Sequence, residues 1–137
     1  MTDLSITPAN VLRGANSRAE NGIFGATVTQ GQVVYRDPAD GRFKLADTDG
    51  AADARVPYGI ALNAGAAGQP ATVLRSGEIA IGATLVPGTT YYLSPTPGGI
   101  APLTDVAVGD DYTVVGIAIS ASVLKVGFLV SGVTRAT

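Results

Sequence analysis

Residues 25–35 read GATVTQGQVVY and residues 82–92 read GATLVPGTTYY, so nearly the same phrase occurs twice, 57 positions apart. The same spacing pairs GIA at residues 59–61 with GIA at residues 116–118, and no gap is needed between them. The shared residues are mainly Gly, Pro and Tyr. Because Gly permits positive φ and Pro fixes φ, such a repeat maintains turn geometry. The unbroken register favours a duplicated unit over coincidence in a chain rich in Gly and Ala.

We therefore predict two similar β units, over about residues 25–75 and 82–132. The expected elements of the first are a strand at residues 32–36, a turn at 37–41, and strands at 42–45, 59–61, 71–75 and 78–81, the last two joined by a turn at Ser76 and Gly77. Those of the second are a strand at 90–93, a turn at 94–99, a returning strand from 100, a strand at 116–118, and an apolar strand at 123–130 in the centre of the sheet. A helical turn is expected only within residues 8–19. The sequence thus predicts an all-β barrel or sandwich of about eight to ten short strands.

Length and composition limit the classes of protein to which the chain can belong. With 137 residues, 46% of them hydrophobic and 15% charged, it is predicted to be one globular domain, or two small halves that share a core. A net charge of −2 provides no basic surface for nucleic acid or for an anionic membrane. The sequence has no apolar run of membrane-spanning length, and its first ten residues lack the pattern of a secretory signal.

Residues 1–22 lie outside the repeat and are predicted to be an irregular N-terminal arm that precedes a β domain at residues 23–137. The arm is mostly polar, but four aliphatic side chains are spaced along it, and its two arginines suit an acidic partner. It is either a frayed terminus or a segment that becomes ordered when a partner binds. The candidate partner-binding residues are Leu4, Ile6, Val11, Leu12, Arg13 and Arg18.

Sites for catalysis or metal binding are easier to exclude than to find. The chain has neither His nor Cys, so it lacks the commonest general base and any thiolate ligand. Asp47, Asp49 and Asp53 lie close in sequence, but the terminal Glu of a calcium-binding loop is missing, and a solvated loop is expected. Ser122 and Lys125 have the S-x-x-K spacing of a serine nucleophile and its activating lysine. A strand would place them on opposite faces, so we interpret this match as chance.

Three further patterns also have structural interpretations. Asp110 and Asp111 are predicted to form a turn before a strand. Residues 65–68 (GAAG) resemble a phosphate-binding loop only in their glycines, because no Lys-Ser/Thr pair follows them. The five tyrosines could form a sugar-stacking platform, although such residues more often pack at the surface with the hydroxyl in water. We expect no catalytic residue, no metal site and no cofactor, and hence no enzymatic activity.

Several motifs together carry a resemblance to a known family. They are GQVVY at residues 31–35, LAD at 45–47, GIALN at 59–63, AGQP at 67–70, YYLS at 91–94 and PGGIAP at 97–102. Over most of residues 23–132 the chain resembles the small head decoration proteins, or capsid cement proteins, of tailed bacteriophages. These motifs are strands and turns rather than catalytic signatures.

The resemblance implies a virion structural protein, made in the host cytoplasm and located on the outer surface of the capsid. Proteins of this family bind the major capsid protein, commonly as homotrimers, and stabilise the shell against the pressure of the packaged DNA. The resemblance implies no catalytic residues. Phage tail-fibre modules also use Tyr-x-Leu-Ser and Pro-Gly-Gly segments, so a tail-fibre or receptor-binding β module that contacts host-surface glycans is the alternative.

Overall fold

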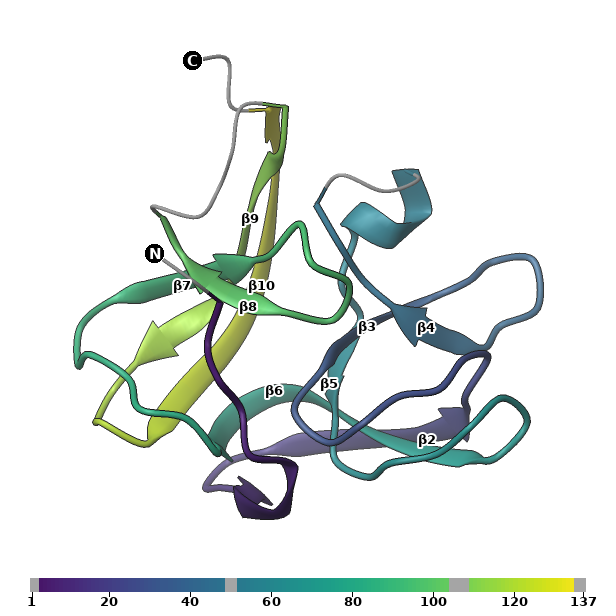
Figure 1. Cartoon of the computed structure of the whole chain (residues 1–137), viewed down its shortest axis with the longest axis horizontal. Helices are drawn as coiled ribbons and strands as arrows, with labels where there is room; N and C mark the ends of the chain where they lie inside the picture. Colours follow the sequence, from purple (N-terminus) through teal and green to yellow (C-terminus); the bar gives the residue numbers. More distant parts are fainter. Residues whose placement is uncertain (1–2, 49–51, 104–108, 135–137) are drawn as a thin grey trace.

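The computed structural model describes residues 3–48, 52–103 and 109–134, and these form a curled antiparallel sheet (Figure 1). The strands are β1 (Val11–Arg13), β2 (Arg18–Ile23), β3 (Val33–Arg36), β4 (Phe43–Leu45), β5 (Gly59–Ala61), β6 (Pro70–Ile81), β7 (Thr90–Leu93), β8 (Ile100–Pro102), β9 (Asp111–Ala118) and β10 (Val123–Thr134). Two short 3₁₀ helices, η1 (Pro8–Asn10) and η2 (Ala52–Arg55), complete the described elements. The prediction of an all-β protein with strands in this number is confirmed.

The strand order expresses the sequence repeat directly. It reads β4-β3-β5-β6-β10-β9-β7-β8, so the order of the first unit is mirrored by that of the second about the β6–β10 pair. The hairpin of β3 and β4 corresponds to that of β7 and β8, with every strand boundary shifted by 57 residues. Figure 1 shows the two units side by side, with β3 to β5 on the right and β7 to β10 on the left. The predicted duplication is therefore present in the fold.

The last strand of each unit follows a different offset. Ile60 of β5 pairs with Leu74 of β6, whereas the equivalent Ile117 of β9 pairs with Lys125 of β10. The offset between Leu74 and Lys125 is 51 instead of 57, because the segment between the paired strands is shorter in the second unit. Strand pairing is therefore the same in both units, and the two units differ in the length of a surface connection, where insertions and deletions are tolerated best.

Two hydrophobic clusters stabilise the sheet. The first-unit core consists of Phe24, Val28, Val34, Phe43, Ala61, Ala71 and Val73. The central core lies between the units and includes Val11, Val33, Ile60, Leu74, Ile79, Leu93 and Val115 together with six residues that repeat the first-unit core. Those six equivalent pairs are Phe24 and Ile81, Val28 and Leu85, Val34 and Tyr91, Phe43 and Ile100, Ala61 and Ala118, and Val73 and Leu124. The duplicated sequence thus buries the same positions in both units.

The N-terminal segment differs from the predicted irregular arm. Within residues 1–22, Val11–Arg13 and most of Arg18–Ile23 are strands, and both strands pair with β6. In Figure 1 the beginning of the chain also runs across the front of the molecule, between the two units. The prediction failed because these strands are stabilised by a partner strand more than 45 residues away in the chain, at Pro70–Ile81, which local patterns do not reveal.

The predicted turn at Ser76 and Gly77 is also wrong. Residues Pro70–Ile81 form one continuous strand, and the chain accommodates an irregularity there without reversing. The register shifts opposite this point, between Arg18 and Ala19, and Gly77 has φ of +101°. Ser-Gly is compatible with a turn or with a β-bulge, and the pairing of β6 with strands on both of its sides favours the bulge.

Candidate interaction surfaces

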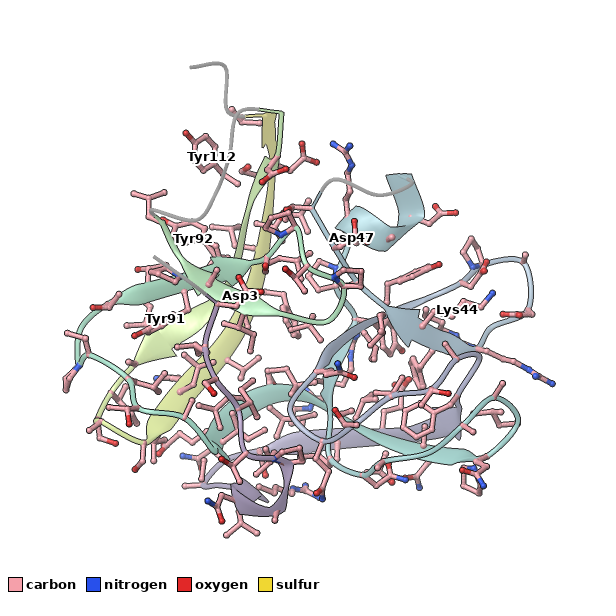
Figure 2. All side chains as sticks on the ribbon, viewed as in Figure 1. Asp3, Lys44, Asp47, Tyr91, Tyr92 and Tyr112 are labelled. Carbon is pink, nitrogen blue, oxygen red and sulfur yellow. The ribbon has the colours of Figure 1, made fainter. Side chains whose placement is uncertain are left out.

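The beginning of the described chain is tied to the body of the protein by polar contacts. The Asp3 carboxylate accepts a hydrogen bond from the Ser94 hydroxyl at 2.7 Å, and Figure 2 shows Asp3 lying in front of the second unit. The backbone N–H of Leu4 donates to the carbonyl of Ile100 at 2.8 Å, which satisfies part of the outer edge of β8. Sequence reasoning missed Asp3 as an anchor, because its partner lies 91 residues away in the chain.

The six candidate partner-binding residues fall into two groups. Leu4 and Ile6 pack against the central core, and Val11 belongs to it with 4% of its surface exposed. Leu12 is 65% exposed, and Arg13 and Arg18 are also at the surface. The suggestion that all four aliphatic residues reach for a neighbouring subunit is thus corrected for Leu4, Ile6 and Val11, which fill the core of their own chain. Leu12, Arg13 and Arg18 remain accessible to a partner.

The two arginines have different surroundings. The Arg13 side chain donates to the Ser17 hydroxyl at 2.6 Å and to the Ser17 carbonyl at 3.0 Å, so it braces the connection between β1 and β2. Arg18 lines an open hollow of about 370 Å³ together with Glu20 and Arg75. The lining of this hollow is polar and carries both signs of charge, which suits a polar contact with a partner.

Tyr58 is the centre of a polar cluster next to that hollow. The Arg75 guanidinium lies 3.5 Å from the centre of the Tyr58 ring, and the Tyr58 hydroxyl donates to the Glu20 carboxylate at 2.5 Å. The ring of Phe43, in the first-unit core, is 5.5 Å from that of Tyr58. These contacts join β2, β4 and β6 through Tyr58, which directly precedes β5, so we assign the cluster a structural role.

The β3–β4 hairpin carries an ion pair, whose Lys44 is labelled in Figure 2. The Lys44 ammonium lies 2.6 Å from the Asp37 carboxylate and 3.4 Å from that of Asp40. The hydrogen bond from Lys44 lowers the pKa of Asp37, and the same bond raises the pKa of Lys44. The pair stabilises a hairpin turn, which in the second unit is formed by Pro and Gly residues without charge.

The five tyrosines lie in different surroundings. Tyr91 is buried, and its hydroxyl accepts a hydrogen bond from the Val86 N–H at 3.1 Å. Tyr35 packs against the central core, and burial raises its pKa. Tyr92 and Tyr112 are half-buried on the side of the second unit, where Figure 2 shows both.

The other excluded sites can now be placed. Asp49 of the candidate calcium loop lies outside the described residues; within them, no three His, Cys, Asp or Glu side chains gather to hold a metal ion. Asp111 does not lie in a turn: it begins β9 and forms an ion pair with Arg55 of η2 at 3.3 Å, which joins the two units. Ser122 precedes β10, and Lys125 projects from its exposed face.

Comparisons with known proteins add no relative: no protein-family model matches the chain, and no curated protein does. In the part of the chain that the structure describes, no helix has the length and apolar character needed to cross a bilayer.

Proposed function

We propose that this chain is a virion structural protein that decorates the outer surface of a phage capsid and stabilises it by binding the major capsid protein. It acts there as a homo-oligomer, and the resemblance to capsid cement proteins favours a trimer. The resemblance supplies the identity of the partner. The all-β fold built from two units is compatible with this role.

The observation that carries the proposal is the amount of exposed apolar surface. Among the described residues, large apolar side chains that are 41–65% exposed are Leu12, Ile23, Val56, Val86, Leu103, Ile117, Ile119, Leu129, Val130 and Val133. Single exposed apolar residues are ordinary, but a protein of this size that carries so many is typical of chains that work in contact with other proteins. Seven of the ten lie in the second unit or directly after it, two lie on β1 and β2, and only Val56 lies in the first unit. The second unit and the N-terminal strands therefore both offer candidate contacts for assembly.

The surface formed by β1 and β2 is the candidate contact with the shell. Leu12 and Arg13 of β1 and Arg18 at the start of β2 are all exposed, and β6 holds both strands in place. Two exposed arginines and an exposed apolar side chain on these strands suit an acidic shell surface that has apolar depressions. Because this surface is already ordered by pairing with β6, binding does not have to supply the conformational entropy of ordering an arm.

The test is cosedimentation of the purified protein with empty shells assembled from the major capsid protein encoded in the same genome. We expect saturable binding with a fixed number of copies per capsid, and a higher temperature of shell disruption. The variant Arg18→Glu should weaken binding about tenfold or more, because it places a carboxylate against an acidic surface. The matched control Arg42→Glu, which changes an exposed arginine outside β1 and β2, should bind like the wild type.

Failure of the wild-type protein to bind these shells would reject the proposal. Saturable binding to host-surface glycans, together with that failure, would support the tail-fibre alternative. Equal loss in the Arg18→Glu and Arg42→Glu variants would leave decoration standing but remove the β1–β2 surface as its contact.

A further inference from the structure

The second unit has an apolar sheet face that is turned away from the central core. Strand register defines it, because residues directly opposite each other on paired strands share a face. Thr90, Ile117 and Lys125 form one row across β7, β9 and β10. Tyr92, Val114 and Leu129 form the next row across the same strands. The register shifts between the two rows, so Val114 lies on the same face as Ile117 although the two are three residues apart in β9. We call these six residues the outer face.

The corresponding face of the first unit is buried. Val33, Ile60 and Leu74 form its first row across β3, β5 and β6, and none of the three has any exposed surface. Their equivalents in the second unit are the row of Thr90, Ile117 and Lys125. Ile117, identical to Ile60, is 48% exposed. One face of the repeated unit is therefore covered in the first copy of the unit and open in the second.

What covers the face in the first unit is this chain itself. The side chains of Val33, Ile60 and Leu74 pack in the central core, which also contains Leu93 and Ile100 of the β7–β8 hairpin. The N–H of Val33 donates to the carbonyl of Gly98, in the turn of that hairpin, at 3.0 Å. The N–H of Gly98 donates in turn to the carbonyl of Ala46 at 2.7 Å. From the N-terminal segment, Leu4 and Ile6 pack on the same core. In the first unit, this sheet face is therefore covered by other segments of the same chain.

The outer face has the composition of an interface more than that of a core. Leu129, Ile117, Val114 and Tyr92 provide apolar and aromatic contacts, whereas Lys125 stands where the buried Leu74 stands in the first unit. Lys125 lies directly opposite Glu78 of β6 in the strand pairing. Each copy therefore carries both signs of charge side by side, so two copies can approach this face with their charges complementary.

We propose that the outer face binds a second copy of this chain. The contact supplies a subunit interface for the homo-oligomer proposed above, and it rests on that proposal only for the number of subunits. It lies on β7, β9 and β10, whereas the shell contact was assigned to β1 and β2. Figure 1 shows β2 at the bottom of the molecule and the far ends of β9 and β10 at the top.

Two variants with matched side chains test this contact. Ile117 is 48% exposed on the outer face, and Ile23 is 45% exposed at the end of β2, where it pairs with Pro70 of β6. Light scattering and sedimentation equilibrium of the wild-type protein should give a mass that is a multiple of 13.7 kDa. Ile117→Lys should raise the dissociation constant of self-association about tenfold or more, because it places a charge in a desolvated contact, and Ile23→Lys should leave it unchanged.

A second measurement, thiol reactivity, tests the contact without requiring that a substitution weaken self-association. Because the chain has no cysteine, Ile117→Cys and Ile23→Cys each introduce a single thiol. The thiol at position 117 should react with a maleimide about tenfold more slowly in concentrated than in dilute protein, while the rate at position 23 should not depend on concentration.

A wild-type protein that is monomeric at every concentration, or a thiol at position 117 that reacts at the same rate throughout, would overturn the proposal. Equal weakening of self-association by Ile117→Lys and Ile23→Lys would also overturn it. Shell binding is a separate readout: loss of shell binding with self-association intact would reject the decoration function and leave this contact standing.

Discussion

Gly59 of β5 and Gly116 of β9 occupy the same position of the repeat, and both lack a side chain for the same reason. A β-carbon at Gly59 would lie 2.8 Å from the carbonyl oxygen of Leu74, and one at Gly116 would clash with the carbonyl oxygen of Lys125. The obstacle is backbone in both cases, so it cannot turn away as a flexible side chain can. This pair of glycines supports the offset of 51 between β6 and β10 independently of the strand pairing.

We therefore expect Gly116→Ala to destabilise the protein by about 1–3 kcal/mol, because the added methyl group must force β9 and β10 apart. Gly127 is the matched control. It lies in β10, the strand that pairs with β9, and a β-carbon there would have no atom within 4 Å. Gly127→Ala should change the free energy of unfolding by no more than about 1 kcal/mol. Urea unfolding curves measure both, and equal effects would contradict the packing described for Gly116.

The Asp37–Lys44 pair predicts a pH dependence whose sign follows from its pKa shifts. Because the pKa of Asp37 is lowered in the folded protein, its contribution to stability is present above the ordinary carboxyl pKa of about 3.9 and is lost as the pH falls through the lowered value. Asp37→Asn should therefore lower the melting temperature near pH 7 and converge with the wild type in strong acid. In a Lys44→Gln background, the pH-dependent effect of Asp37→Asn should be smaller but not absent, because the Ala39 N–H still donates to the Asp37 carboxylate.

At the scale of elements, the N-terminal segment forms two strands of the sheet, β1 and β2. Two adjacent residues of β1 differ in their contribution to stability. Val11 is buried in the central core, whereas Leu12 is mostly exposed. Val11→Ala should cost about 1–3 kcal/mol of stability through lost burial and a small cavity, and Leu12→Ala should change it by less than about 0.5 kcal/mol. Thermal unfolding followed by circular dichroism would decide; a harmless Val11→Ala would mean that this segment does not belong to the core.

How much of the fold the sequence could predict depends on how local the cause of each element is. The two hairpins were predicted closely, because their turns are determined by residues within them: Gly41 and Gly98 have φ of +71° and +78° at equivalent positions. Strands β1 and β2 were missed, because their polar sequence becomes a strand only beside β6. Of the candidate contact residues, Leu12, Arg13 and Arg18 are accessible, but the outer face could not be recognised. Ile60 and Ile117 are identical residues, and only the packing of the two units buries one and exposes the other.

At the scale of the whole molecule, the two units share one core and should unfold together. The central core takes residues from both units, and the Arg55–Asp111 ion pair also connects them. Calorimetry should therefore show a single transition whose calorimetric and van 't Hoff enthalpies agree. Two separated transitions would mean that the units are independent domains despite their shared core.

The claim that this protein decorates a capsid is tested most directly by electron cryo-microscopy of shells with and without added protein. Shells assembled from the major capsid protein of the same genome should gain density on their outer surface only, at one set of symmetry-related positions. The fold described above should fit that density with β1 and β2 toward the shell and the outer face against a neighbouring copy. Reconstructions that show no added density at saturating protein would contradict the account.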